Sequence, residues 1–408
     1  MKNCIPQGAA RIIERLEAAG HEAYLVGGAV RDVVMYGAPL ASSDCDIATS
    51  APPDETARVF SDLRVIETGI KHGTVTVLLD GTPYEITTYR SESGYGDCRH
   101  PDSVEFVSSI AEDLARRDFT MNAIAASTDG SLVDLFGGEE DIARRLVRAV
   151  GNPATRFSED ALRILRGLRF AARLGFAIEP ATRDAMLECA HLVSQVSGER
   201  VREELVRLLL GEHMLGLLTS SYDIISRALP DFASASPAAF ADAARAASRQ
   251  RPEPEPRLAA LLSCLPDPEP LLDRLALDRR TRSRIELLLC EAPMLTTAPE
   301  SESELLRLMS RHGGDGASAL LAYRAAFCDS ACTAAAFASV SSLVTELDRS
   351  GAVYSVASLA IGGGDLVALG YPPSPEISRL LSELLSAVID GRVENTRDAL
   401  VAYLDRIK

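Results

Sequence analysis

Residues 25–49 read LVGGAVRDVVMYGAPLASSDCDIAT, and this stretch decides the fold of the first part of the chain. The apolar run 23–26 predicts a short strand that enters a Gly27-Gly28 turn and then a helix, AVRDVVMYG. Backbone N–H groups at a glycine turn before a helix bind anions such as phosphate. Arg31 lies one turn into this helix, where it could reach such a phosphate.

Two acids follow on alternate residues of an apolar segment, Asp44 and Asp46. Residues i and i+2 of a strand point to the same face, so the two carboxylates would lie side by side. Ionising both is unfavourable without a cation between them, and Mg²⁺ binds carboxylate oxygens together with phosphates. The Asp-x-Asp pattern also occurs in polar turns, but the preceding glycine turn and Arg31 favour a metal site.

A third acid lies in the segment 74–90, TVTVLLDGTPYEITTYR. Two alternating, β-branched runs flank Asp80-Gly81, which predicts a tight hairpin. Glu85 is the only carboxylate in the second run, and an ordinary surface position on that strand is the alternative. With the acid pair on a neighbouring strand, Glu85 would complete a site for two-metal phosphoryl or nucleotidyl transfer.

Composition indicates a globular protein of several domains: 408 residues, 47% of them apolar and 25% charged. No apolar run is long enough to cross a membrane and no signal core begins the chain, so we expect a cytoplasmic protein. The eight cysteines show no metal-binding spacing. A net charge of −16 argues against a nucleic-acid binder, although residues 140–210 contain more basic than acidic side chains.

The apolar pattern changes from mixed α/β to purely helical at residues 152–176, NPATRFSEDALRILRGLRFAARLGF, and stays helical to the end. The predicted fold is therefore an α+β head, a mixed sheet with helices, followed by an elongated all-α body. Breaks in the helical pattern fall near Gly211, at 249–258 and around 292–302.

One helix of this part is predicted to begin at an N-cap, Ser158, with Glu159 and Asp160 in its first turn. At 100° per residue, one face carries the apolar residues Leu165, Leu168, Ala171 and Ala172. A second face carries four arginines: Arg163, Arg166, Arg169 and Arg173. A solvated arginine face is the alternative interpretation.

The same helix would place Asp160, Arg163 and Arg166 along one edge of a nucleotide cleft, with Glu159 orienting Arg163. Cytosine and adenine each present an amino donor beside a ring-nitrogen acceptor. A carboxylate accepts from the amino group, and a guanidinium donates to the ring nitrogen. Guanine and uracil present a carbonyl to the carboxylate and are rejected, because buried polar groups would stay unpaired.

Several motifs occur in a fixed order: LVGGAVRD…DCDIAT, YEITTYR, EDLARRDFTMNAIA, LVDLFGGEEDI, the segment 152–176 and GERVREEL. Together they resemble the class II tRNA nucleotidyltransferases and the related bacterial poly(A) polymerases of the DNA polymerase beta superfamily. Residues 360–404 are similar to the C-terminal segment of the shorter bacterial CCA-adding type, which lacks a phosphohydrolase domain.

The resemblance implies a role for each residue of the head. Asp44 and Asp46 would be the Mg²⁺ ligands, with Glu85 as the third catalytic acid. The glycine turn, through Gly28, and Arg31 would hold the triphosphate.

Further residues would bind the nucleotide, which is CTP or ATP. Arg117 would contact the incoming nucleotide, and Asp118 would help to recognise its ribose. The base would be selected by residues of the segment that opens the body: Glu159, Asp160, Arg163, Arg166 and Arg169.

The activity implied is template-independent addition or repair of the 3′-terminal CCA of tRNA, with release of pyrophosphate. The partners would be the acceptor stem and T-arm of tRNA, with no membrane and no DNA. We expect a catalytic head (1–150), a base-recognition neck (151–213), an RNA-binding body (214–300) and a tRNA-binding tail (301–408).

Alternatives remain open. They are a poly(A) polymerase, an enzyme that adds only A or only CC, an RNA-binding module without chemistry, and a small-molecule nucleotidyltransferase. The last would leave residues 151–408 without a role. The loop residues Asp97-Cys98-Arg99 resemble the loop that accompanies terminal A addition, with cysteine where relatives commonly have glycine.

Overall fold

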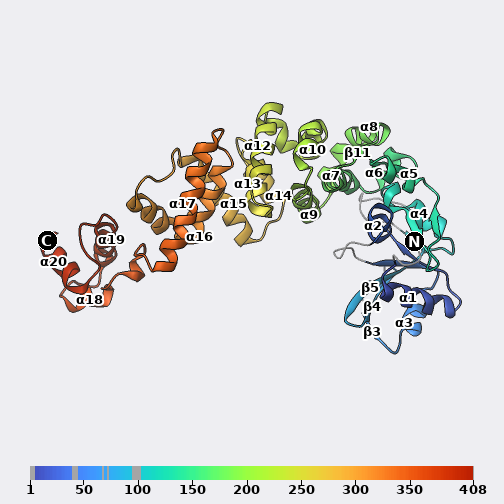
Figure 1. Ribbon diagram of the computed structural model, residues 1–408, viewed down its shortest axis with the longest axis horizontal. Coiled ribbons are helices and arrows are strands. Elements are labelled where there is room, and N and C mark those ends of the chain that lie inside the picture. The colour runs from blue at the N-terminus through green and yellow to red at the C-terminus, as the bar shows by residue number, and fades with distance from the viewer. Residues whose placement is uncertain (1–4, 39–44, 67–68, 71–72, 94–102, 408) are drawn as a thin grey trace. The chain divides into compact units, whose positions relative to one another are not determined.

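The structure is a computed structural model that describes residues 5–38, 45–66, 69–70, 73–93 and 103–407. Contacts divide the chain into two compact units. The first comprises residues 1–241 and 265–277, and the second comprises residues 242–264 and 278–408. The first unit contains a mixed sheet with helices and the second is helical (Figure 1). This confirms the expected fold class, while the four-part domain division stays a prediction.

The sheet of the first unit has seven strands in the order β3-β4-β5-β2-β1-β8-β9. Only β2 and β5 pair in parallel, and every other neighbouring pair is antiparallel. The strands are β1 (Ala23–Val26), β2 (Asp46–Thr49), β3 (Arg64–Ile66), β4 (Thr74–Leu79), β5 (Thr82–Thr88), β8 (Ile124–Ala126) and β9 (Leu132–Asp134).

The hairpin predicted around Asp80-Gly81 is confirmed. Both turn residues have positive φ, 52° for Asp80 and 80° for Gly81, as a two-residue type I′ turn requires. Leu79 pairs with Thr82 directly across the turn. The turn fixes the register of β5 on β4 and thereby decides which face of the sheet Glu85 occupies.

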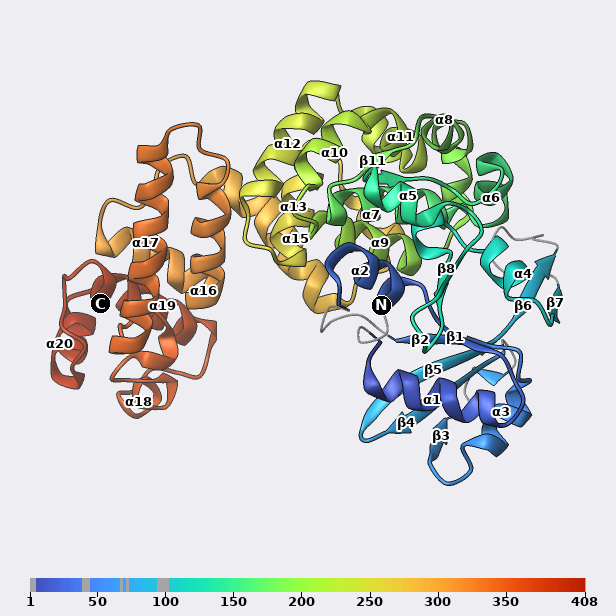
Figure 2. The ribbon, with the colours of Figure 1, turned by 45° about the vertical axis from the view of Figure 1, so that its right-hand side comes forward.

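Helices cover the sheet on both faces. Helix α1 (Gln7–Ala18) packs on β1 and β2, and α3 (Pro53–Val59) packs on β4 and β5 (Figure 2). Helix α2 (Gly28–Tyr36) follows the glycine turn and packs against β1 and β8. The other elements of the head are β6 (Arg90–Ser93), β7 (Ser103–Phe106), α4 (Ile110–Ala115), η2 (Thr120–Asn122) and α5 (Gly138–Ala143).

Helices continue the first unit after the sheet, joined by one short parallel strand pair, β10 (Leu146–Val147) with β11 (Ala177–Ile178). The helices that follow the head are α6 (Pro153–Glu159), α7 (Leu162–Leu174), α8 (Pro180–Cys189), η3 (Ala190–Gln195), α9 (Gly198–Leu209), α10 (Met214–Ser220), α11 (Tyr222–Ala228), η4 (Pro230–Ser234) and α14 (Glu269–Arg274).

The predicted helix start at Ser158 is wrong. The segment forms two helices, and the first, α6, starts before Ser158. Asn152 caps α6 by accepting from the Thr155 backbone N–H, and a proline follows at the first helical position. The chain leaves the helix at Asp160, whose φ and ψ are −140° and 101°. Its carboxylate accepts from the Leu162 backbone N–H at 3.1 Å and so opens α7.

The apolar face predicted for this segment is confirmed in α7. Leu165, Leu168, Ala171 and Ala172 are all buried. Helix α7 lies beside α9, and Gly211 fits against the Ala172 backbone, where a Cβ would come within 2.7 Å. The close approach at Gly211 coincides with the predicted break in the helical pattern.

The second unit consists of helices in its described residues. The breaks expected at 249–258 and 292–302 are present, and α12 (Pro237–Arg249) spans the boundary between the units. The other elements are α13 (Pro254–Leu262), α15 (Arg279–Glu291), η5 (Ala292–Met294), α16 (Glu302–Ala325), α17 (Ala331–Ser350), η6 (Val356–Ser358), α18 (Gly363–Ala368), α19 (Pro375–Ile389) and α20 (Arg397–Ile407). Among the helices described, none has the length and apolar character to cross a membrane.

Truncating the core of α7 should destabilise the fold strongly. Leu168 is fully buried, so Leu168→Ala is expected to lower the free energy of unfolding by about 2–5 kcal/mol through lost transfer energy and a residual cavity. Leu135, which is 55% exposed, is the control: Leu135→Ala should change the free energy of unfolding by less than about 0.5 kcal/mol. Urea denaturation measures both, and equal losses would contradict the assignment of Leu168 to the core.

Candidate active site

Two of the three predicted acids meet on neighbouring strands. Asp46 opens β2 and lies in register with Glu85 of β5 in the parallel pair. Residues in register on paired strands point to the same face, so both carboxylates lie on one side of the sheet. Asp46 is half-buried and Glu85 is exposed. The third predicted acid, Asp44, lies outside the described residues.

The glycine turn lies against this acid pair. Val26, the last residue of β1, is in register with Asp46, and Gly27 follows with φ 73° and ψ −133°. A Cβ on Gly27 would come within 3.7 Å of Asp46 Oδ2 and 3.4 Å of Arg117 Nη1. The turn, the carboxylate and the guanidinium therefore surround one space that a longer side chain would fill.

The residues present fit a divalent cation. Asp46 and Glu85 supply carboxylate oxygens, which are the ligands that Mg²⁺ prefers, and the Gly27 turn beside Asp46 starts a helix, where backbone N–H groups favour phosphate. Within the part of the chain that the structure describes, no group of three or more His, Cys, Asp or Glu side chains gathers as a metal site. The described site thus contributes two acids, and Asp44 would be the third.

Arg117 is fixed by an acid that the sequence analysis did not name. Asp113 accepts from Arg117 Nη2 at 3.1 Å and from Arg116 Nη2 at 2.7 Å. Burial alone would raise the pKa of Asp113, but the charges of Arg116 and Arg117 hold it below its ordinary value. The available signal was the spacing, since an acid four residues before an arginine forms a pair on a helix.

Arg31 lies inside the first unit, with only 3% of its surface exposed. It donates from Nε and Nη2 to Asp32 Oδ1 at 3.0 and 2.7 Å, and from Nη1 to Asn122 Oδ1 at 2.9 Å. Its Nη2 lies 3.6 Å from the place of a Cβ on Gly28, so the guanidinium runs alongside the glycine turn. Its contact with a triphosphate stays a prediction.

Asp118 joins the head to α7. Its Oδ2 accepts from Arg166 Nε and Nη2 at 2.9 and 2.6 Å, and its Oδ1 accepts from Asn122 Nδ2 at 3.2 Å. Burial would raise the pKa of Asp118, but the Arg166 charge and the hydrogen bonds from Arg166, Asn122 and the Phe119 backbone lower it to about 2. Asp118 is therefore ionised and orients Arg166.

Glu204 of α9 continues this network and was also missed from the sequence. Its carboxylate lies 2.6 Å from Arg169 Nε and 3.7 Å from Arg166 Nη1. The Phe170 ring has three guanidinium carbons within 6 Å of its centroid: Arg169 at 4.1 Å, Arg31 at 5.5 Å and Arg166 at 5.7 Å. Polar contacts, with Asn122 as the one uncharged link, thus connect the glycine turn to α9.

The expected pair of Glu159 and Arg163 is present, with Nη1 2.8 Å from Oε2. Arg163 also donates to the backbone oxygens of Arg156 and Arg116, both at 3.1 Å. Asp160 accepts from Arg200 Nη2 at 2.9 Å. Arg163 and Arg169 are each 8% exposed and Arg166 is half-buried, whereas Arg173 is exposed. The arginine face is therefore buried at the junction of head and neck and reaches the solvated surface at Arg173.

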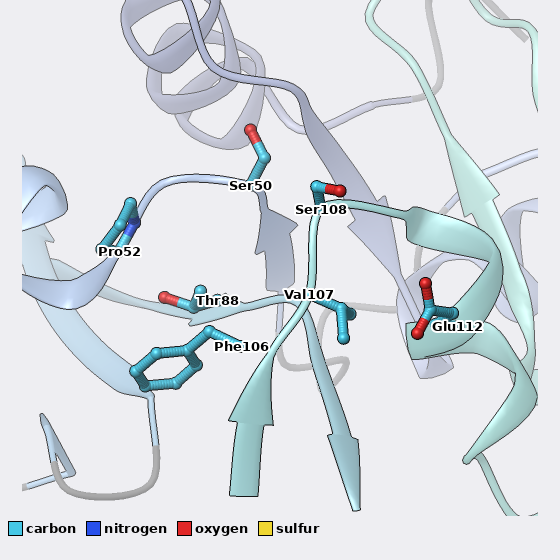
Figure 3. Close-up of a pocket in the computed structure, with 7 residues that line it drawn as sticks. All are labelled: Ser50, Pro52, Thr88, Phe106, Val107, Ser108 and Glu112. Atoms are coloured by element: carbon cyan, nitrogen blue, oxygen red, sulfur yellow. The ribbon is translucent and has the colours of Figure 1, made fainter.

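A separate pocket of about 440 Å³ lies at the other end of β2 and β5 (Figure 3). Ser50 and Thr88, which line it, stand at the ends of the two strands opposite Asp46 and Glu85. The pocket is therefore apart from the acid pair. Its lining residues are Ser50, Pro52, Thr88, Phe106, Val107, Ser108 and Glu112. The loop residues Asp97, Cys98 and Arg99 lie outside the described residues.

Comparison with known proteins gives the site its context. Residues 23–148 match the family described as the poly A polymerase head domain, residues 175–218 the probable RNA and SrmB-binding site of polymerase A, and residues 336–404 a putative tRNA nucleotidyltransferase domain 2. The chain is 36% identical over 403 residues to the CCA-adding enzyme of Lactobacillus delbrueckii subsp. bulgaricus, covering 96% of each chain. The chain belongs to the CCA-adding enzymes.

Other relatives agree with this CCA-adding family. The enzyme of Streptococcus gordonii is 37% identical over 416 residues, with 98% of each chain covered. The crystal structure of the Bacillus stearothermophilus CCA-adding enzyme in complex with CTP superimposes with a TM-score of 0.80 at 33% identity, covering 98% of this chain and 96% of that one. The resemblance seen in the motifs is confirmed: the chain is a nucleotidyltransferase of a generally metal-dependent family.

The Asp118–Arg166 pair should give stability a defined pH dependence. The folded pKa of about 2 lies below the ordinary value, so the ionised pair stabilises the fold at neutral pH and loses this effect as pH falls from about 4 towards 2. Asp118→Asn is expected to lower the free energy of unfolding by about 2 kcal/mol, equally at pH 8 and pH 5. Below pH 4 the difference in this free energy between the variant and the unchanged protein should become smaller. Chemical denaturation at each pH measures the difference.

The control is Asp54→Asn, which removes an exposed carboxylate paired with Arg58 on the same helix. Its effect should stay small at every pH, because exposed pairs contribute little. If Asp118→Asn has the same free energy of unfolding as the unchanged protein at pH 7, or if its loss at pH 3 equals its loss at pH 7, the proposed strength of the buried pair is contradicted.

Proposed function

We propose that this chain adds or repairs the 3′-terminal CCA of tRNA from CTP and ATP, without a nucleic-acid template and with release of pyrophosphate. One observation carries the proposal: Asp46 and Glu85 lie in register beside the Gly27 turn and Arg117, in a chain that is related to CCA-adding enzymes over its whole length. Structures of related enzymes in complex with CTP, ATP and tRNA support these substrates.

The acids of the head would hold the metal. Asp46 and Glu85, with Asp44, would bind Mg²⁺. When bound, Mg²⁺ supplies positive charge that neutralises the triphosphate and lowers the pKa of the attacking 3′-hydroxyl of the RNA. Gly27 and Gly28 present backbone N–H groups to phosphate oxygens at the start of α2, where the helix dipole favours negative charge.

The arginines around this space orient the nucleotide. Arg117 adjoins the space beside Gly27, and Asp113 holds its guanidinium in one direction. Arg31, held by Asp32 and Asn122, would direct its guanidinium along the glycine turn. Asp118 would contact the ribose, and it also accepts a hydrogen bond from Arg166 of α7, which links the ribose contact to that helix.

The residues around the start of α7 select the base. Asp160 supplies the carboxylate that accepts from an amino group, and Arg163 supplies the donor to a ring nitrogen. Glu159 and two backbone oxygens fix the Arg163 guanidinium, and Glu204 fixes Arg169 beside it. A guanidinium held by several bonds loses little entropy when it binds a base, so protein side chains can replace a template strand.

The helical parts that follow the head would grip the acceptor stem and T-arm of tRNA through phosphate contacts, with the neck, body and tail divided as the sequence predicts. Such an enzyme would act in the cytoplasm, where tRNA is matured. A poly(A) polymerase, or an enzyme restricted to A or to CC, is the nearest alternative in reaction type.

The product distinguishes these activities. Incubation of the protein with tRNA that ends at its discriminator base, together with CTP, ATP and Mg²⁺, should give a ladder of one, two and three added nucleotides that stops at CCA. Asp46→Ala should reduce the rate at least about 10³-fold, because a metal ligand is lost, whereas Asp54→Ala should leave the rate unchanged. Long A tails, or no incorporation of C, would refute CCA addition.

Arg163 should set the choice of base. Arg163→Ala is expected to lower the preference for CTP over GTP by about 10- to 100-fold, because the donor to the ring nitrogen is lost. The ratio of kcat/KM for the two nucleotides measures it. The control is Arg183→Ala, which removes an α8 arginine that pairs with Asp223 of α11. An unchanged CTP/GTP ratio in Arg163→Ala would show that this side chain does not read the base.

A further inference from the structure

Helix α15 of the second unit begins with an unusual concentration of positive charge. Its first six residues, RRTRSR, contain four arginines. Arg282 forms an ion pair with Glu286 at 2.6 Å. The other three, Arg279, Arg280 and Arg284, are exposed, and their guanidinium groups form no ion pair with any described residue.

These positions are unfavourable for the helix itself. The N-terminus of a helix carries partial positive charge and repels cations, yet Arg279 and Arg280 are its first two residues. Arg280 and Arg284 are four residues apart, and like charges at that spacing repel each other. The N-cap gives no reason for the arginines, because Asp278 already accepts from the backbone N–H groups of Arg280 and Thr281, both at 3.0 Å.

Packing does not explain the arginines either. Helix α15 attaches to its neighbours through the buried residues Ile285 and Leu288, whereas Arg279, Arg280 and Arg284 stay exposed. The exposed residues of the first two turns are arginines and Ser283 only, with no exposed apolar side chain among them. A protein-binding surface would be expected to offer apolar or aromatic anchors, so this composition favours a polyanion.

Several other arginines of the second unit pair with carboxylates within the fold. Examples of such pairs are Arg245–Asp242, Arg307–Asp390, Arg379–Glu376 and Arg397–Asp365. Elsewhere in this unit, the described exposed arginines without a carboxylate partner do not gather in threes: Arg311, Arg349 and Arg406 stand apart, and Arg249, next to Arg251, donates to the backbone oxygens of Ala326 and Cys328. In a chain with a net charge of −16, the start of α15 is therefore an uncompensated positive surface.

We infer that Arg279, Arg280 and Arg284 form a contact surface for the phosphate backbone of the RNA substrate. A guanidinium donates two parallel hydrogen bonds to phosphate oxygens, which suits arginine to this task better than lysine. The inference rests on the proposed function for its RNA, and it assigns part of the RNA grip to a segment that none of the matched family regions covers. This surface determines affinity and leaves base selection to the first unit.

The double variant Arg280→Gln/Arg284→Gln tests the surface in the full-length protein. The Kd for tRNA lacking its 3′ CCA is measured between about 50 and 200 mM salt, a range in which phosphate contacts dominate affinity. Each lost phosphate contact should reduce the slope of log Kd against log salt by about 0.9, and Kd at 50 mM should rise about tenfold or more. The KM for tRNA should rise in proportion, while kcat at saturating tRNA stays unchanged.

A matched control removes the same charge from the same unit. Arg245→Gln/Arg379→Gln deletes two exposed arginines that have carboxylate partners, and it should leave the salt slope unchanged. Thermal denaturation of both variants verifies that each is folded.

Three results would overturn the inference. One is a salt slope and a KM for tRNA in the α15 variant equal to those of the unchanged protein, which would show that this surface does not bind the RNA. Another is an equal loss in both variants, which would reveal only a general charge effect. The third is a fall in kcat without a change in Kd. Failure of the unchanged protein to extend tRNA would instead refute the proposed function, so the two failures are distinguishable.

Discussion

The parallel pairing of β2 with β5 is the constraint on which the site depends. In this otherwise antiparallel sheet, it sets Asp46, the first residue of β2, opposite Glu85 in the middle of β5. A shift of one residue would turn Glu85 to the face that α1 and α3 cover, where a carboxylate would be buried without a partner. The Asp80-Gly81 hairpin prevents that shift by fixing β5 on β4. A tight turn on the far side of the strand thereby positions Glu85, the acid proposed to complete the metal site.

The second organising feature is a network of charged side chains and one amide that joins the head to the neck. It runs from Asp32 and Arg31 through Asn122 and Asp118 to Arg166, and then to Glu204 and Arg169. Such groups are stable away from water only when each has partners, because an unpaired buried charge is strongly destabilising. The network therefore holds the arginines that would read a base in one arrangement relative to the acids that would hold the metal.

Sequence patterns were sufficient for features that depend on local interactions. The hairpin follows from Asp80-Gly81 and the α7 core from helical spacing, and the Glu159–Arg163 pair is only four residues apart. The helix start predicted at Ser158 was wrong, because Asn152 followed by a proline is the stronger cap signal. Glu204 and Asn122 escaped notice because their partners are distant in the sequence: 38 residues separate Glu204 from Arg166, and 91 separate Asn122 from Arg31. No periodicity reports such contacts.

The backbone conformation of Gly27 limits which residues can replace it. Its φ of 73° and ψ of −133° are the mirror image of a conformation that ordinary L-residues adopt readily. A Cβ would meet Arg117 and Asp46 only at ordinary van der Waals distance, so handedness, more than volume, excludes alanine. A D-alanine introduced by chemical synthesis would fit where its L-enantiomer is strained. Among the residues that the ribosome incorporates, glycine is therefore the one that adopts this backbone conformation without strain.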